Sequence, residues 1–219
     1  SPIGKWFHYG TIRIENEAIN NTIKISDISR PHEFLRVIER SMHPENNHFH
    51  IEPNLEKLLT LEEHERLEFK SSLRYDHKNN QINKDLERAA LKTIAAFLNT
   101  KGGHLIIGIN DKKEPMGLHK DYETLRRQDS DGFENHFTQV FNFMIGPEFR
   151  HLVKLWFNPY QVIEICIIQV APSNRPVYLK FEDSEYFYVR TGNVTTPLKL
   201  SEVEAYRRSR WPQRITASI

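Results

Sequence analysis

The chain has 219 residues, of which 38% are hydrophobic and 27% charged, a composition typical of a folded globular protein and not of a disordered one. Its 30 Lys and Arg residues oppose 29 Asp and Glu residues, so the formal net charge is +1 and a nucleic-acid site would need local clustering of cations. A single cysteine excludes an intramolecular disulfide and a multi-cysteine zinc site, and no apolar run is long enough to cross a bilayer.

Residues 1–42 predict two short strands and a helix. Alternating runs over 11–15 and 22–26, separated by a polar turn, predict a hairpin. Over 31–42, Phe34, Val37, Ile38 and Met42 recur at helical spacing. This extension is too short to form a core of its own. We therefore expect the extension to be the remnant of something larger, or to pack against the main domain.

Residues 43–57 predict a linker, because HPENNHFHIEPN is polar, contains two prolines and shows little periodicity. Three histidines, His43, His48 and His50, lie in this segment. His48 and His50 have the i, i+2 spacing that can bind a transition metal, but no further anchoring ligand is nearby, so a polar loop is favoured.

Residues 58–212 predict one mixed α/β domain, with strands over 67–70, 104–110, 152–157, 161–170 and 186–190 and helices over 83–99, 131–145 and 200–208. The tripeptide Asn158-Pro-Tyr predicts the turn of a hairpin. Ser201 and Glu204 have the spacing of a capping box. Lys101-Gly-Gly predicts a helix C-cap and turn, since it follows a helix and lacks the Gly-Lys-Ser/Thr ending of a phosphate loop.

The segment Leu67-Glu-Phe-Lys carries the first candidate chemistry. Alternate side chains of a strand share a face, so Glu68 and Lys70 should point together, away from the core. A carboxylate that holds a metal beside a lysine that supports phosphate charge suits a metal-dependent nuclease, with Glu63 and Asp111 as further ligands for Mg²⁺ or Mn²⁺. The alternatives are an ordinary surface salt bridge for Glu68 and Lys70 and solvated acids for the trio.

A second candidate surface lies in the C-terminal third. From residue 173 to 214, eight basic residues oppose five acidic ones, a local excess of three. The turn after Arg190, which includes Asn193 and Thr195, offers backbone N–H groups and hydroxyls to phosphate oxygens. The expected backbone-binding residues are Lys92, Lys101, Lys180, Arg190, Asn193 and Thr195. The alternatives are an ordinary solvated surface and a turn stabilised by its own hydroxyls.

Residues 62–211 resemble the Schlafen AlbA-like domain, often labelled in bacteria as DNA-binding or divergent ATP-binding. The resemblance rests on Glu63, LEFKSS, KTIAAFLNTKGGHLIIGIND, APSNRPVYLK, FYVRTGNVTTPL and the terminal Arg210-Trp211. It implies an α/β fold, that is, an α+β mixed sheet forming a single Schlafen AlbA-like lobe with a small strand-strand-helix extension. The first 42 residues resemble the end of a bacterial PH-like domain found beside membrane-spanning helices, which implies a membrane tether upstream and a location on the cytoplasmic side. The alternative is an unrelated two-stranded extension.

Vertebrate members of this family resemble metal-dependent endoribonucleases that cleave structured RNA such as tRNA. Their acidic triad corresponds to Glu63, Glu68 and Asp111, each of which is acidic here. Two departures weaken the assignment of this activity to the chain. His64 stands where a small hydroxyl residue is usual. The chain has one lobe, whereas the vertebrate enzymes have two lobes and a zinc site. A single lobe implies a homodimer that rebuilds the clamp by two-fold symmetry.

Three functions follow as hypotheses. The leading one is a domain that binds RNA or DNA and cleaves structured RNA with Mg²⁺ or Mn²⁺. The first alternative is a non-catalytic DNA- or RNA-binding module, whose binding would be salt-sensitive and would tolerate loss of all three acids. The second is a membrane-tethered interaction or nucleotide-sensing domain without affinity for polynucleotides.

Overall fold

The computed structural model describes residues 9–16, 21–29 and 52–212. The chain divides into two compact units, Ser1–Ile51 and Glu52–Ile219. In the first unit, β1 (Tyr9–Asn16) pairs antiparallel with β2 (Asn21–Ser29), with a register irregularity between Gly10 and Ile12. The predicted hairpin is therefore confirmed, with longer strands than expected. The helix predicted over 31–42 lies outside the described residues, as does most of the predicted linker.

A four-stranded mixed sheet forms the centre of the second unit, in the order β3-β6-β8-β7. β3 (Leu67–Lys70) lies parallel to β6 (Gly103–Ile107), which pairs antiparallel with β8 (Ile163–Val170). β7 (Val153–Tyr160) pairs antiparallel with β8 and forms an edge. The mixed α/β fold expected from the sequence is confirmed, and the apolar strand after Gly102 occupies an interior position in the sheet.

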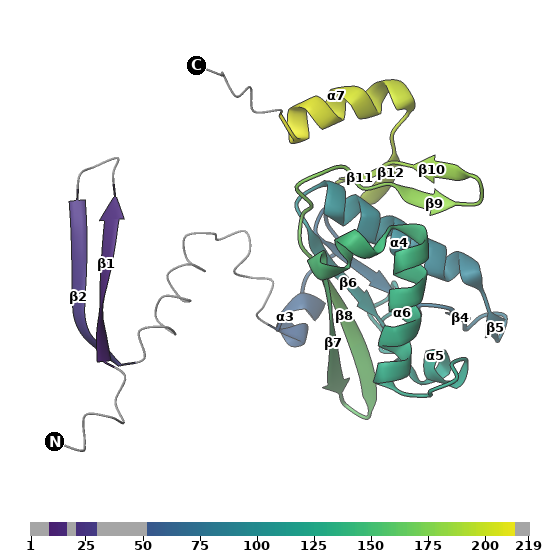
Figure 1. Ribbon diagram of the computed structural model, residues 1–219. Helices are drawn as coiled ribbons and strands as arrows, with labels where there is room; N and C mark the ends of the chain where they lie inside the picture. The colour runs from purple at the N-terminus through teal and green to yellow at the C-terminus, as the bar shows by residue number, and fades with distance from the viewer. Residues whose placement is uncertain (1–8, 17–20, 30–51, 213–219) are drawn as a thin grey trace. The chain divides into compact units, whose positions relative to one another are not determined.

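Helices cover both faces of this sheet, because alternate strand residues are apolar on both sides (Figure 1). On one face, Leu105, Ile107 and Ile168 join the large core formed with α4 (Lys84–Asn99) and α6 (Ser130–Met144). On the other, Ile106 and Ile167 pack in a smaller core with α3 (Leu55–Leu59). α3 begins three residues before residue 58, where the sequence predicted the domain to start.

Local sequence signals set both ends of α4. Asn83 caps its N-terminus by accepting a hydrogen bond from the Asp85 N–H at 2.9 Å. At the other end the Gly102 N–H donates to the Phe97 carbonyl at 3.0 Å, and Gly102 has φ +71°. A Cβ on Gly102 would lie 2.4 Å from the Val170 carbonyl oxygen. The C-cap prediction for this turn is confirmed, because both the backbone conformation and the close approach of β8 require glycine.

The remaining elements are short. They are β4 (Tyr75–Asp76), β5 (Gln81–Ile82), α5 (His119–Glu123), the 3-10 helix η3 (Pro147–Leu152), β9 (Leu179–Phe181), β10 (Ser184–Tyr186), β11 (Tyr188–Thr191), β12 (Val194–Pro197) and α7 (Leu200–Arg210). β9 pairs with β10 and β11 with β12, each antiparallel. Among the described residues, no helix is long and apolar enough to cross a membrane.

Three predicted boundaries were wrong. Asn158-Pro-Tyr belongs to β7 and the turn follows at Gln161, because Pro159 is tolerated on an edge strand. The strand predicted over 186–190 is split at Phe187, where the chain changes partner from β9 to β12. α7 is capped earlier than expected: the Lys199 N–H donates to Glu202 Oε2 at 2.7 Å, and Glu204 pairs with Arg208 instead.

We expect Gly102→Ala to lower the free energy of unfolding by at least about 2 kcal/mol, because the added Cβ meets backbone that cannot move independently of β8. Gly192→Ala is the matched control. Gly192 has φ +63°, but a Cβ at this position would have no atom within 4 Å, so only the backbone strain of about 1 kcal/mol should remain. Urea denaturation measures both. Equal losses would show that crowding at Gly102 contributes nothing.

Candidate nucleic-acid interface

The alternation predicted for β3 is confirmed, but its polar face is not open to solvent. Leu67 and Phe69 pack into the smaller core, and Glu68 points to the other side. There the Glu68 side chain is 11% exposed and lies between two cations. Lys70 Nζ donates to Glu68 Oε1 at 2.5 Å, and Arg190 Nη1 donates to Glu68 Oε2 at 2.9 Å. Both carboxylate oxygens therefore already have a charged partner.

Arg190 is a buried residue and not part of an exposed phosphate-binding turn. Its side chain is 1% exposed and its guanidinium lies 5.2 Å from the centre of the Phe97 ring. It also donates to Thr195 Oγ1 at 3.0 Å and to the His64 carbonyl at 2.9 Å. Arg190 thus joins β11 to β3 and to the end of α4, and the Thr195 hydroxyl on β12 accepts one of its hydrogen bonds.

The three predicted metal ligands do not converge in the structure. Glu63 precedes β3, and its Oε1 accepts the Phe69 N–H at 2.8 Å. Asp111 lies in the turn after β6 and is exposed. Within residues 9–16, 21–29 and 52–212, no group of three or more His, Cys, Asp or Glu side chains is arranged to hold a metal ion. The side chains around Glu68 therefore fit a buried ion-pair network better than a metal-binding site.

His104 adds no positive charge to this region at neutral pH. It lies on β6, paired with Leu67 of β3. Burial, together with the nearby Arg66 and His64, lowers its pKa to about 4, so the imidazole is neutral well above that pH.

A groove lined by cations lies instead between the 174–180 segment and α7. It consists of two adjoining hollows of about 660 and 340 Å³ that share Arg175, Pro176 and Arg207. Its cations are Arg175, Lys180, Arg207 and Arg208, and its carboxylates are Glu148, Glu185 and Glu204. We call this surface the basic groove.

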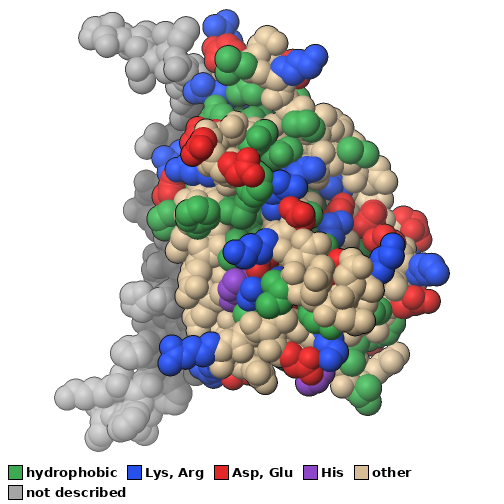
Figure 2. Space-filling view, turned by 90° about the vertical axis from the view of Figure 1, so that its right-hand side faces the viewer, with side chains coloured by type: hydrophobic (Ala, Val, Ile, Leu, Met, Phe, Trp, Pro, Cys, Tyr) green, Lys and Arg blue, Asp and Glu red, His purple; other side chains and the backbone are tan. Residues whose placement is uncertain are grey.

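The ion pairs within the basic groove are exposed and weak. Arg175 lies 3.8 Å from Glu148, and Arg207 lies 3.8 Å from Glu204, with each side chain about half exposed. Such pairs contribute little to stability, so these cations can exchange a carboxylate for a phosphate. Figure 2 shows that cationic, anionic and hydrophobic side chains are interspersed on the face it presents, in keeping with a net charge of +1.

The other predicted binding residues occupy different places. Lys180 is exposed on β9 and lines the basic groove. Lys92 lies on α4 with its ammonium 5.3 Å from the centre of the Tyr188 ring. Lys101 is exposed and pairs with Glu65 at 3.2 Å. Asn193 is exposed in the turn between β11 and β12. Roles for Lys92, Lys101 and Asn193 in binding stay predictions.

Sequence reasoning missed the residues that build the groove. Arg175, Arg207 and Arg208 were only counted among the basic residues from 173 to 214. No pattern in the neighbouring sequence indicates that the loop before β9 faces α7. It also missed Asn99, a fully buried residue of α4 whose amide bonds the backbone of Val177 and Tyr188. A polar residue at an apolar helix position was the available signal.

We expect Glu68→Ala to lower the free energy of unfolding by about 3 kcal/mol, because it leaves the buried Arg190 guanidinium without its ionic partner. Asp111→Ala is the matched control: the exposed Asp111 makes no hydrogen bond or ion pair within the described chain, so a change within about 0.5 kcal/mol is expected. Urea denaturation followed by tryptophan fluorescence measures both variants. Wild-type stability in Glu68→Ala would rule out a structural role for the pair.

Comparison with known proteins identifies the domain. The Schlafen, AlbA_2 family model matches residues 63–199. The chain is similar to the DIP2311 protein of Corynebacterium diphtheriae, at 19% identity and a TM-score of 0.48, over 71% of this chain and 28% of that one. It is also similar to the N-terminal domain of a RecG-related protein of Nitrosomonas europaea, at 20% identity and a TM-score of 0.41, over 62% of this chain and 84% of that one. Because the family model covers more than half of its residues, the chain belongs to the Schlafen AlbA_2 family.

Proposed function

We propose that this domain binds the sugar–phosphate backbone of nucleic acid along the basic groove. Family membership suggests a nucleic-acid-binding domain. The single observation that supports the groove as its site is Lys180, which lines the basic groove and also a second hollow containing Arg74, Lys84 and Arg88. One lysine therefore links two cationic surfaces into one track.

The charge along this track favours a polyanion. Across the basic groove and the second hollow, seven Lys and Arg side chains oppose four carboxylates. The whole chain is nearly neutral, so the excess is local, which is the electrostatic footprint expected of a phosphate-backbone site.

Aromatic side chains beside the track can stack on bases. The Tyr186 and Tyr188 rings are stacked, with centres 6.1 Å apart and planes 23° apart, and Tyr186 is 39% exposed. Tyr186 is therefore not a core residue. Arg88 and Lys92 lie one helical turn apart on α4, over Phe181 and Tyr188 respectively. Alternating cations and aromatic rings are typical of surfaces that bind unpaired strands.

Such contacts position a backbone and carry little sequence information. The proposal therefore includes RNA and DNA as ligands and expects weak sequence preference. Preference for structured RNA such as tRNA, and a homodimer that places two grooves side by side, remain finer predictions of the family resemblance. Light scattering would test the dimer.

Replacing both Arg175 and Arg207 with Ala should weaken binding of labelled tRNA and duplex DNA by about ten-fold or more, and should reduce the slope of log K against log salt by about 2, because two phosphate contacts are lost. Fluorescence anisotropy at several salt concentrations measures both quantities. The control is Lys57→Ala with Arg66→Ala, which removes two exposed cations outside the basic groove. Equal weakening by the control would contradict the groove as the site.

Metal-dependent cleavage by Glu63, Glu68 and Asp111 with Mg²⁺ or Mn²⁺ is the second candidate. Its support is that Glu63 Oε1 accepts the N–H of Phe69, the residue that follows Glu68, and that Lys70 Nζ donates to Glu68 Oε1. Its difficulty is the pairing of Glu68 with Arg190, which a cation site would have to rearrange.

If the cleavage hypothesis holds, incubation of the domain with tRNA and Mn²⁺ yields fragments that Asp111→Ala no longer produces. Asp111 is the informative position because its replacement leaves the buried ion pair intact, whereas Glu68→Ala also lowers stability. Gel electrophoresis of the RNA measures the products, and Asp183→Ala, another exposed aspartate, serves as control. Absent cleavage, or equal cleavage by both variants, rejects this hypothesis and leaves the binding function untouched.

A further inference from the structure

The second hollow lies between α4, α6 and β9 and has a volume of about 480 Å³, within the range of small-molecule sites. Its apolar lining comes from Val140, Phe143, Met144 and Phe181. Phe143 is 79% exposed, although the other phenylalanines of α6 are buried. An exposed aromatic ring at the rim of a hollow is a surface that a flat ligand could cover.

Cations surround this apolar lining. Arg74, Lys84, Arg88 and Lys180 oppose the single carboxylate of Glu87. Counting only these Lys, Arg and Glu side chains, the lining carries three net positive charges. The Arg88 guanidinium lies 4.3 Å from the centre of the Phe181 ring, so the two form a flat surface with cationic character, suited to stacking on a base.

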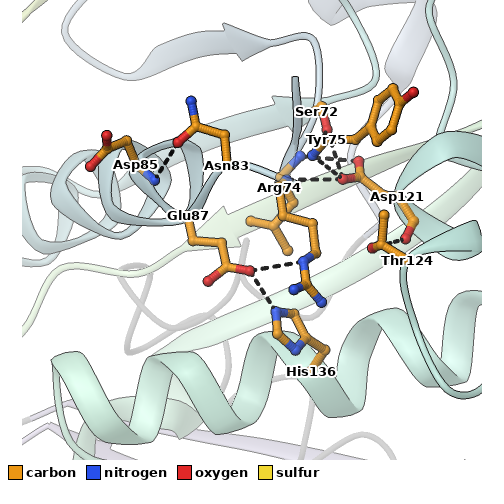
Figure 3. Close-up of polar contacts among 10 residues, drawn as sticks. Ser72, Arg74, Tyr75, Asn83, Asp85, Glu87, Asp121, Thr124 and His136 are labelled. Atoms are coloured by element: carbon orange, nitrogen blue, oxygen red, sulfur yellow. Dashed lines mark hydrogen bonds and ion pairs between the residues drawn. The ribbon is translucent and has the colours of Figure 1, made fainter. Parts of the chain in front are cut away.

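One end of the hollow is a polar cluster with an incompletely bonded arginine. Figure 3 shows Arg74 and His136 both directed at the Glu87 carboxylate. His136 Nε2 lies 2.8 Å and Arg74 Nε 3.1 Å from Glu87 Oε1. The Arg74 side chain is 14% exposed, and its terminal nitrogens make no hydrogen bond with any residue that the structure describes. Those donors are available to an anion in the hollow.

Hydrogen bonds hold the backbone at Arg74, and the ion pair with Glu87 holds its side chain. The buried Asp121 carboxylate accepts the N–H groups of Leu73, Arg74 and Tyr75 and the Ser72 hydroxyl, at 2.6 to 3.1 Å (Figure 3). The Arg74 carbonyl accepts a hydrogen bond from the N–H of Asn83, and Asn83 is the residue that caps α4. An anion at Arg74 would therefore meet a preorganised donor.

We infer that this hollow binds one nucleoside monophosphate unit, with the phosphate at Arg74 and Lys84 and the base against Phe143 and the Arg88–Phe181 surface. Gln139, which also lines the hollow, offers an amide that can bond a base edge. The unit could be a free mononucleotide or an unpaired nucleotide of a bound strand. Only the strand source rests on the proposed function, because it needs a polynucleotide in the adjoining basic groove.

Isothermal titration of the full chain with AMP, UMP, ribose 5-phosphate and inorganic phosphate tests the free source. We expect a mononucleotide to bind at least about ten-fold more tightly than ribose 5-phosphate or phosphate. Phe143→Ala and Arg74→Gln should each weaken that binding by roughly five-fold or more. Leu200→Ala, which removes another strongly exposed apolar side chain, and Arg66→Gln should bind as the wild type does.

Anisotropy with a labelled single-stranded pentanucleotide and a labelled duplex tests the strand source. Weaker single-strand binding in Phe143→Ala, with unchanged duplex binding, supports this source even if free mononucleotides do not bind. The inference is overturned if Phe143→Ala changes neither mononucleotide binding nor single-strand binding, or if inorganic phosphate binds as tightly as the nucleotides.

The proposed function is judged separately. If the inference fails but duplex binding is lost in the variant that lacks Arg175 and Arg207, the proposed function stands. Binding of AMP without any affinity for polynucleotides would reject the proposed function and retain this site.

Discussion

The side chain of Asn99 joins the C-terminal part of the domain to the central helix, and the proposed sites depend on it. Its amide nitrogen donates to the carbonyls of Val177 and Tyr188 at 2.8 and 3.0 Å, and its oxygen accepts the Val177 N–H at 2.9 Å. The Asn99 carbonyl also accepts the Tyr206 hydroxyl at 2.9 Å. A fully buried amide left without these partners would be costly, so the segment from 177 to 188 is held against α4. That segment carries Lys180 and Phe181, and through Tyr206 the same residue anchors α7.

Burial distinguishes Arg190 from the arginines of the basic groove. Arg190 is enclosed with Glu68, where loss of either partner leaves an unpaired charge in the interior. Arg175, Arg207 and Arg208 make exposed pairs with carboxylates, which solvent screens. Arg190 maintains the fold, and the arginines of the basic groove are free to meet a ligand. The surface that we propose to bind phosphate therefore lies away from Glu68 and Lys70, the first candidates in the sequence.

Much of the fold follows from local patterns. The apolar face of the helix over 83–99 and its glycine stop predict α4 to within a residue. The Asn83 cap, which the sequence interpretation placed inside the helix, was seen only in the structure. Strand boundaries were less accurate where the chain changes partner at Phe187 or carries Pro159 on an edge. Strand ends depend on which neighbour is available, and that neighbour lies far away in the sequence.

The sequence by itself determined the alternation of β3, the extent of α4, the need for glycine at position 102 and the family to which the chain belongs. Only the tertiary structure decided that Arg190 is buried against Glu68 and that Arg175, Lys180 and Arg207 line one groove. The reason is physical: periodicity and capping are set by neighbours within a few residues. Whether a charged side chain is paired, buried or exposed is set by residues more than a hundred positions away, as Glu68 and Arg190 show.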